Sequence, residues 1–453
     1  MHYVKSKYKN EVSDAQLLEG ALKGMLSNLD KFSEFLTLED ASSFFGGIEG
    51  TYKGIGVVIS KDETGLISVD RVFKDAPAYN AGVIEGDRIL QVDELSVLEW
   101  TVEEASKKIK GPEGSKVSLK IMRGHKERDI VITRSDVKVN PVDYRIVDGV
   151  GYIKLEQFNL NANSEMDKAL VYMKENKINK LILDLRNNPG GEVGQAVGLA
   201  KNFVPKGLIT RLEFRDPKEK DEDYFSDLES LQYKLVVLVN KNSASASEIL
   251  SGAIQDTNAG TLVGTVTYGK SKVQKVFPIL NKEAFEKNKA DANVEIVDVE
   301  SLSSEMQKKL VDDNIFGWAK ISVGEYFTPK GRRIDLKGIE PDEMVENTDT
   351  VNASLVNAIS PLKKTRKYDV GDEGAEVIQI ERLLSLLGYD VDEADSSYDS
   401  KTFAAVEKYQ REQGIFPYGQ SDFVTQEKMN ASREALLRKF DLQYLKAMEV
   451  VSK

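Results

Sequence analysis

Two runs of largely apolar residues constrain the fold of this chain more than any other feature. They are KLILDL at 180–185 and KLVVLV at 234–239. Neither run alternates polar with apolar residues, as expected of parallel strands that are buried on both faces. Helix-like segments follow at 192–203 and about 245–256, and GTLVGT at 260–265 predicts a third strand. This alternation predicts an α/β core with right-handed crossovers.

The loops that follow the two runs are the first candidates for a functional site. RNNPGGEVG (186–194) follows the first run, and NKNSASAS (240–247) follows the second. Ligands usually bind at the carboxyl ends of the strands in such a sheet. The second loop offers three serines, Ser243, Ser245 and Ser247. The sequence therefore predicts a site with hydroxyl chemistry at this edge.

The composition narrows that chemistry further. The chain has no cysteine and only two histidines, His2 and His125. No thiol nucleophile or disulfide is available, and a catalytic zinc site is not expected, so no metal is predicted. His125 falls in the polar turn RGHK, where a solvated side chain is the expected state. Candidate nucleophiles are then hydroxyls, and candidate bases are Lys, Asp, Glu or Tyr.

Ser245 admits two interpretations at the level of local sequence. With Glu248 it has the spacing of a capping box, in which the serine only satisfies a helix amide. A serine at a helix N-terminus after a buried strand also lies in the positive end of the helix dipole, where free amides can stabilise an oxyanion. Both interpretations remain open on these residues alone.

A base is offered downstream by TYGKSKVQKVFPI (267–279). If this segment is a strand, Lys270, Lys272 and Gln274 share one face. A lysine acts as a base only when it is neutral, and moving its pKa from about 10.4 to about 7 costs roughly 4–5 kcal/mol. Burial against an apolar wall produces such a shift, and Gln274 could orient the amine. The alternative is a solvated strand face with two ordinary lysines.

The other segments differ from this core in their pattern of predicted helices, strands and turns. We expect an N-terminal helical segment, in which 12–28 is an amphipathic helix with Ser13 and Gln16 at capping-box spacing, packed on its own domain or on a partner. Short strands, glycine turns and two short helices then predict a β-rich domain. The expected divisions are 1–50, 51–137, 138–345 with a charged surface insert at 281–316, a linker at 346–366, and a helical domain at 367–453.

Charge and hydropathy exclude further classes. The net charge of −12 and the pI of about 5.1 argue against nucleic acid as a partner. No run of eighteen apolar residues is present, so no membrane span is expected. The N-terminus lacks the apolar region of a signal peptide, so we expect either a cytosolic protein or a targeting segment outside this sequence.

Several segments together resemble the carboxyl-terminal processing proteases, also called tail-specific proteases. The matching text is LLEGALKGML (17–26), GIGVVI (54–59), GDRILQV (86–92), LILDLRNNPGG (181–191), SASASEI (243–249), YGKSKVQ (268–274), YFTPKGRRI (326–334) and GIEPD (338–342). The order and spacing resemble the family over about residues 12–345, and the fourth to sixth motifs are jointly specific. The resemblance implies a ClpP/crotonase-like α/β protease core with an inserted PDZ domain.

The resemblance also implies roles for individual residues. The middle serine of SASAS, Ser245, is the nucleophile of the family, and the lysine of GKxxVQ, Lys270, is its general base. Gln274 orients that lysine. The oxyanion amides are expected from Gly190, Gly191 and Ala246. No cofactor is implied.

Two departures from the family pattern lie close to these residues. The family usually has glycine after the lysine, whereas Ser271 and Lys272 stand here, and Lys272 could compete for the base role. The charged insert at 281–316 replaces what is normally a short connection.

The PDZ-like segment predicts capture of free C-termini. Gly54, Ile55, Gly56 and Val57 would form the loop whose amides receive a terminal carboxylate, while strand addition supplies main-chain bonds. Lys110 is expected to contact the protease body, at a position where the family often has a basic residue.

The C-terminal segment resembles a peptidoglycan-binding helical module. VGDEGAEVIQIERLLSLLGY (370–389) and TFAAVEKYQREQGI (402–415) match its pattern, but the connecting DVDEADSSYDS has no glycine. Peptidoglycan is therefore one expected partner, with packing or dimerisation as the alternative. The amphipathic ends at 12–28 and 426–450 could pair two chains into a homodimer.

The leading expectation is a serine endopeptidase that cleaves proteins recognised by their C-terminal tails, through a Ser–Lys–Gln acyl-enzyme mechanism. An extracytoplasmic location follows from the resemblance, with the signal or anchor outside this sequence. One alternative is an inactive adaptor that binds tails and cell wall. Another is an enzyme held inactive until the PDZ domain binds a tail, in which case an added C-terminal peptide stimulates turnover.

Overall fold

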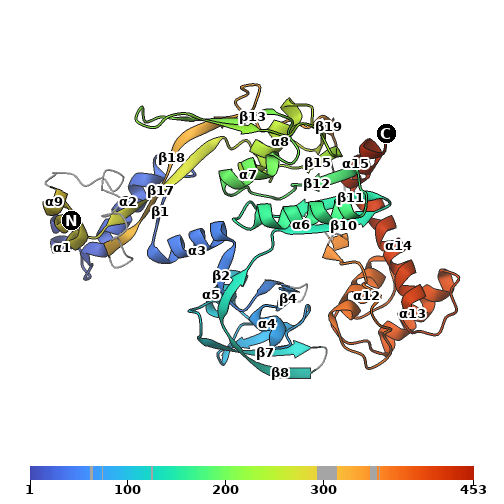
Figure 1. The fold of residues 1–453 in the computed structure, drawn as a ribbon. Helices are drawn as coiled ribbons and strands as arrows, with labels where there is room; N and C mark the ends of the chain where they lie inside the picture. The colour runs from blue at the N-terminus through green and yellow to red at the C-terminus, as the bar shows by residue number, and fades with distance from the viewer. Residues whose placement is uncertain (62–64, 74, 124–125, 293–313, 347–354, 357) are drawn as a thin grey trace. The chain divides into compact units, whose positions relative to one another are not determined.

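A computed structural model describes residues 1–61, 65–73, 75–123, 126–292, 314–346, 355–356 and 358–453. These residues form two compact units (Figure 1). The first unit contains Met1–Gly50 and Asn140–Met344, and the second contains Thr51–Val139 and Val345–Lys453. His125 and most of the predicted charged insert lie outside the described residues, as does much of the predicted linker.

A six-stranded sheet forms the centre of the first unit. Its order is β10 (Val142–Val147), β11 (Val150–Leu155), β12 (Lys180–Asp184), β15 (Lys234–Val239), β16 (Gly260–Gly264) and β19 (Glu343–Met344). The β10–β11 pair is antiparallel, and β11 through β19 run parallel. Both apolar runs predicted from the sequence are central strands, β12 and β15. Each strand has a neighbour on either side in the sheet, and its side chains are buried on both faces.

Helices follow the strands as the alternation predicts. They are α6 (Ala162–Glu175), α7 (Val193–Ala200) and α8 (Ala246–Asp256). The helix α8 contacts β16 of this sheet and β13 (Gly207–Phe214) of a second sheet. Fully buried Leu183, Val237 and Leu250 belong to the core cluster that joins the strands to α8. The α/β class expected for this part of the chain is confirmed.

The second sheet of this unit is antiparallel and includes a strand from the N-terminal segment. Its order is β1 (Glu34–Leu36), β18 (Ile315–Phe327), β13 and β14 (Glu222–Ser226), and β17 (Lys272–Leu280) also pairs with β18. Figure 1 shows β17 and β18 as two long neighbouring strands with β1 beside them. The helices of this region are α1 (His2–Lys7), α2 (Asp14–Ser27), α3 (Leu38–Glu49) and α9 (Lys282–Ala292).

The N-terminal segment is thus part of the first unit rather than a free arm. The capping box predicted for its helix is present, because the Ser13 hydroxyl accepts from the Gln16 amide and the Gln16 side chain accepts from the Ser13 amide. Leu22 and Leu26 of α2 pack with Phe35 and Ala319. This packing anchors α2 to the second sheet.

The first part of the second unit is β-rich. Its strands are β2 (Thr51–Gly54), β3 (Val57–Lys61), β4 (Ile67–Val72), β5 (Arg88–Val92), β6 (Leu95–Ser96), β7 (Lys116–Arg123), β8 (Lys126–Thr133) and β9 (Ser135–Lys138). Two short helices, α4 (Pro77–Asn80) and α5 (Val102–Ile109), accompany them. A sheet of order β3-β4-β5-β7-β8 encloses buried Ile67, Ile89 and Leu119, while β2 pairs with β9.

The second part of this unit is helical, as expected. Its helices are α12 (Ala375–Leu386), α13 (Ser400–Glu412), α14 (Phe423–Phe440) and α15 (Leu442–Ser452). Val377, Leu384, Tyr409 and Met429 form its buried centre. The predicted amphipathic stripe of α14 is therefore used inside the unit. No helix among the described residues is long and apolar enough to cross a bilayer.

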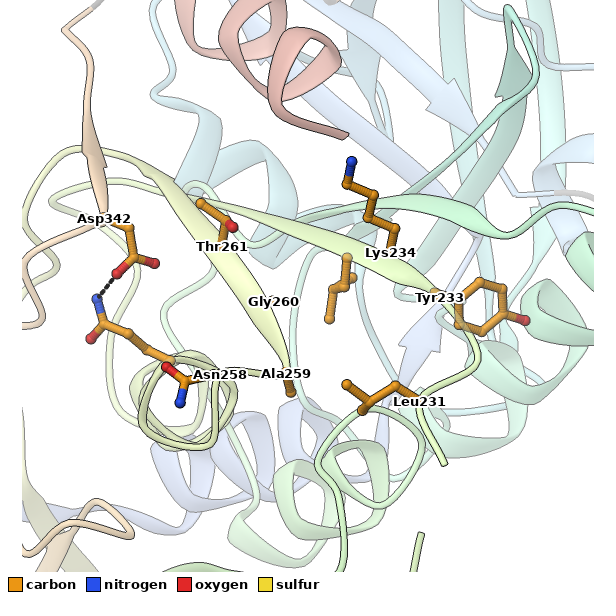
Figure 2. Close-up of a pocket in the computed structure, with 10 residues that line it drawn as sticks. Leu231, Tyr233, Lys234, Asn258, Ala259, Gly260, Thr261 and Asp342 are labelled. Atoms are coloured by element: carbon orange, nitrogen blue, oxygen red, sulfur yellow. Dashed lines mark hydrogen bonds between the residues drawn. The ribbon is translucent and has the colours of Figure 1, made fainter. Parts of the chain in front are cut away.

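A cavity of about 420 Å³ opens at the amino ends of β15 and β16. Figure 2 shows Lys234, Asn258 and Asp342 around it, with Asp342 accepting a hydrogen bond of 3.0 Å from Gln255. The loops that carry the predicted serines follow the carboxyl ends of the strands. The cavity is therefore distinct from the predicted site, and none of the predicted site residues lines it.

Candidate active site

The two predicted loops meet because β12 and β15 are parallel neighbours. Their side chains and backbone are joined by hydrogen bonds. The Asn240 side chain donates to Asn187 Oδ1 at 2.9 Å, and the Asn187 amide donates to Asn240 Oδ1 at 3.0 Å. The Ala244 amide donates to the Asn188 carbonyl at 3.1 Å. The expected juxtaposition of these two loops is therefore present in the fold.

The three serines of the second loop have different environments. Ser243 Oγ donates to the Leu185 carbonyl at 2.8 Å, and Ser247 Oγ donates to the Asn188 carbonyl at 2.9 Å. Both of these side chains are fully buried. Ser245 is partly exposed. Ser243 and Ser247 hold the loops together, which leaves Ser245 as the one hydroxyl of the three that can meet a substrate.

The backbone of Ser245 is strained. Its φ is 56° and its ψ is −116°, in a region that residues other than glycine seldom occupy. Such a conformation costs on the order of 1–3 kcal/mol and persists only where the surroundings impose it. The residue stands immediately before the first turn of α8. The strain turns the serine out of the strand-to-helix path and is typical of a functional residue.

The predicted oxyanion donors separate into two groups. A methyl group added to Gly190 would lie 2.8 Å from Ser245 Cβ and 3.0 Å from the Ala246 amide nitrogen, so the glycine turn lies directly against the serine. The Gly190 amide itself donates to Asn188 Oδ1 at 2.9 Å. Within the described part of the chain, the amides of Gly191 and Ala246 donate to no acceptor. The oxyanion assignment therefore narrows to Gly191 and Ala246.

Glu248 ties the serine to the lysine segment. Its carboxylate accepts from the amides of Ser245 at 2.9 Å, Gly269 at 2.7 Å and Lys270 at 2.9 Å, and from Thr267 Oγ1 at 2.6 Å. The side chain is fully buried. Burial raises the pKa of Glu248, and the four donated hydrogen bonds oppose that shift. The capping-box glutamate thus fixes the backbone of both candidate catalytic residues.

Tyr326 makes a second connection that the sequence interpretation did not predict. Its buried hydroxyl lies within hydrogen-bond distance of the Ser245 carbonyl, at 3.0 Å, and of the Lys270 carbonyl. Tyr326 belongs to YFTPKGRRI, a segment that carried the family resemblance. The presence of Tyr326 in this family motif was the one sequence signal that could have indicated a role for it near the site. Glu248 therefore binds the amides of Ser245 and Lys270, and Tyr326 contacts their carbonyl groups. Together the two side chains join the serine segment to the lysine segment.

Lys270 has the environment expected of a base. Burial lowers its pKa, and the positive charge of Lys320 lowers it further, while Glu248 and Asp30 oppose the shift. The competing lysine is engaged elsewhere, because Lys272 Nζ forms an ion pair with Glu325 and lies 3.8 Å from Asp335. The structure thus distinguishes the two lysines of the motif, and Ser271 between them is fully buried.

The expected common face of Lys270, Lys272 and Gln274 is wrong. The strand β17 begins only at Lys272, so Lys270 lies before it, and the register with β18 shifts between Val273 and Gln274, where Val323 of β18 is the extra residue. Gln274 Nε2 donates to Ser322 Oγ at 3.1 Å. Among the described residues, no hydrogen bond joins Lys270 Nζ to Gln274 or to Ser245 Oγ. Lys270 Nζ instead lies over the Phe32 ring, 4.8 Å from its centre.

Replacement of Glu248 with glutamine tests the connection between the two segments. Glutamine has one acceptor oxygen and would place an N–H group against two of the four donors. We expect a loss of about 2–4 kcal/mol in the free energy of unfolding. We also expect kcat to fall by about a hundredfold, because small displacements of a catalytic pair are costly. Thermal melts and peptide hydrolysis measure the two effects.

The matched control is Glu104→Gln, at the exposed capping box of α5. Glu104 Oε2 accepts from the Thr101 amide at 2.7 Å, and glutamine serves equally well in that position. Its expected change is within about 0.5 kcal/mol. Equal and small effects at both positions would contradict the role given to Glu248.

The predicted carboxylate loop of the second unit contains a turn at Gly56 that only glycine can occupy. Gly56 has φ of +86°, and an added methyl group would lie 2.2 Å from Ala76 Cβ, so only glycine fits. Ile55 is buried, and the strand β3 begins at Val57. Lys110 Nζ lies 5.4 Å from the centre of the Tyr52 ring. Within its own unit, this lysine is therefore adjacent to the base of the loop.

Comparisons with known proteins agree with these features. Residues 149–345 match peptidase family S41, residues 68–123 match a PDZ domain, and residues 373–429 match a putative peptidoglycan-binding domain. These matches and the site define a serine peptidase with two accessory domains.

Curated relatives extend the similarity over most of the chain. A probable CtpA-like serine protease of Staphylococcus aureus strain N315 is 30% identical over 407 residues, covering 89% of this chain and 74% of the relative. A probable CtpA-like serine protease of Staphylococcus haemolyticus is 29% identical over 425 residues, covering 93% and 77%. This chain therefore belongs to the CtpA-like serine proteases of peptidase family S41.

A solved structure is also similar. The photosystem II D1 C-terminal processing protease is 26% identical, with a TM-score of 0.43, over 76% of this chain and 85% of that chain.

Proposed function

We propose that this protein hydrolyses peptide bonds through an acyl-enzyme on Ser245, with Lys270 as general base. The observation that carries this proposal is the four-way hydrogen bonding of Glu248, which joins the backbone of the strained serine to that of the desolvated lysine. A buried carboxylate devoted to this connection is expected where two side chains must react with each other.

The reaction proceeds in two acyl-transfer steps. Neutral Lys270 takes the proton of Ser245 Oγ as that oxygen attacks the scissile carbonyl carbon. The amides of Gly191 and Ala246 donate to the oxyanion that forms. The C–N bond then breaks, and Lys270 returns the proton to the leaving amine. Water attacks the resulting ester and loses a proton to Lys270. As the ester C–O bond breaks, Lys270 passes that proton to Ser245 Oγ, which restores the serine hydroxyl and the neutral lysine. The new carboxylic acid leaves and ionises.

The substrates proposed are proteins with free C-terminal tails. Two features support this proposal: the Gly54–Val57 loop turns at a position that only glycine fits, and β3 lies at the edge of its sheet, where a peptide strand could add. Gln274 is assigned a positioning role near the lysine rather than direct contact with it.

The accessory domains suggest a cell-envelope location with peptidoglycan as a partner. The match over 373–429 supports this assignment, although the 390–400 connection contains no glycine. Self-association is proposed through α2, where Leu18 and Met25 are exposed apolar side chains at helical spacing, with exposed Leu29 just after the helix.

Covalent labelling tests the proposed nucleophile. We expect a fluorophosphonate probe to modify the full-length protein once, with the adduct mapped by mass spectrometry to Ser245. Labelling should disappear in Ser245→Ala and persist in Ser247→Ala. An adduct on another residue would overturn the assignment, and a folded wild-type protein that takes no label would instead favour an inactive adaptor.

A further inference from the structure

The ammonium group of Lys270 lies over an aromatic ring contributed by the N-terminal segment. Lys270 Nζ is 4.8 Å from the centre of the Phe32 ring. This distance is within the range of a cation–π interaction. Phe32 belongs to the short connection between α2 and β1, which is remote in sequence from the S41 match at 149–345. In this structure the amine of the proposed base therefore rests on the face of the Phe32 ring.

The connection that carries Phe32 is held in a fixed shape. Asp30 Oδ1 accepts from the amides of Phe32 at 2.9 Å and Ser33 at 2.8 Å. Lys31 Nζ donates to the Tyr268 hydroxyl at 2.7 Å, two residues before Lys270. Ser33 is buried, and its hydroxyl accepts from the Ser322 amide at 3.1 Å. The loop is thus attached to the segment that carries the lysine, through Tyr268, and to β18, through Ser322.

Gln274 belongs to the same hydrogen-bond network as the loop that carries Phe32. Gln274 Nε2 donates to Ser322 Oγ at 3.1 Å, and the Ser322 side chain is hydrogen-bonded to Asp30. Burial would raise the pKa of Asp30, but these hydrogen bonds and those of the loop amides outweigh it and lower the pKa. The glutamine therefore supports the loop under the lysine.

We propose that Phe32 is a positioning residue that holds the charged form of Lys270 over its ring and releases the neutral form to act on Ser245. This inference rests on the proposed role of Lys270 as the base. The face of an aromatic ring attracts an ammonium ion and has no such attraction for a neutral amine. Protonation of the lysine and its resting position are thereby coupled by one side chain.

Other charged groups also face this ammonium. Lys320 of β18 and Lys31 of the loop disfavour its charge, while Glu248 of α8 and Asp30 of the loop favour it. The ring adds to the second group. Replacing the ring with an apolar side chain keeps the desolvation and removes this attraction, so the pKa of the lysine should fall.

The test is the pH dependence of kcat/KM for Phe32→Leu in the full-length protein with a peptide substrate. Because the rate rises as Lys270 loses its proton, we expect the acid limb to move down by about 0.4–1.5 pH units. The rate well below the wild-type pKa should rise about 3- to 30-fold, and the high-pH plateau should stay within about twofold. Phe32→Tyr, which keeps the ring, should leave the limb unmoved.

Phe214→Leu is the matched control. Lys275 Nζ lies 5.0 Å from the centre of the Phe214 ring, so this change removes an equivalent cation–π contact from a lysine with no proposed catalytic role. Its acid limb should match that of the wild type. A limb that stays in place or moves upward in Phe32→Leu would overturn the role of Phe32. Phe32→Met provides the same test if the leucine variant melts early. Turnover retained by Lys270→Met would instead show that the assignment of the base is wrong.

Discussion

Ser245→Ala should reduce kcat on the order of a million-fold while leaving the fold intact. The nucleophilic oxygen is lost, and the remaining binding and oxyanion groups supply only residual catalysis. The measurement is hydrolysis of a peptide with a free C-terminus, together with a thermal melt. The backbone conformation of Ser245 is as unfavourable for alanine as for serine, so the free energy of unfolding should stay within about 0.5 kcal/mol.

Ser245→Gly makes a sharper companion experiment. It removes the same oxygen, but glycine occupies a positive φ at no steric cost. We expect this variant to be equally inactive and more stable by about 1 kcal/mol, which is part of the strain held at this position. Ser243→Ala is the control, because its hydroxyl serves structure by donating to Leu185. It should lose about 1 kcal/mol of stability and keep most of its activity. The opposite pattern would assign the nucleophile to Ser243.

Lys270→Met should lower kcat/KM by about 10⁴-fold near neutral pH, since no other base accepts the serine proton. The same change should stabilise the protein by on the order of 1 kcal/mol, because a cation with a lowered pKa is removed from a buried site. The folded pKa is below the unfolded value. The gain is therefore complete below the folded pKa and shrinks as the pH approaches about 10.4.

Lys272→Met provides the comparison for the lysine variant. Lys272 differs in its contacts, since it is paired with Glu325, which also pairs with Arg333 at 2.7 Å. We expect its activity to stay within a few-fold of wild type. If Lys272→Met were inactive and Lys270→Met active, the assignment of the base would be reversed.

The core and the position of the serine loop could be predicted because both depend on local patterns. Unalternating apolar strands at 180–185 and 234–239 indicate parallel strands, and parallel neighbours bring their following loops to one edge. The family motifs then indicated which of the three serines and which lysine to prefer. The structure supplies the physical distinction, since Ser243 and Ser247 are buried and bonded to backbone carbonyls.

The connections between segments were beyond local pattern. The start of β17 at Lys272, which leaves Lys270 outside the strand, is set by pairing with β18, a segment much later in the chain. Glu248 gave a capping signal, but its bonds to Gly269 and Lys270 depend on the tertiary fold. Nothing in LDKFSEFL relates Phe32 to Lys270, because that contact exists only when β1 joins β18. Long-range pairing decides all three.

The central place of β18 in the second sheet has a consequence for biosynthesis. β1, β13 and β17 all pair with this strand, which ends at Phe327. Until those residues have been made, β1 has no strand to pair with and Tyr326 cannot join the serine segment to the lysine segment. A nascent chain that ends before this strand therefore lacks the Tyr326 connection between the two segments that carry Ser245 and Lys270. The strand that completes the second sheet is thus also the strand that completes the proposed catalytic centre, and both events wait for the same late part of the chain.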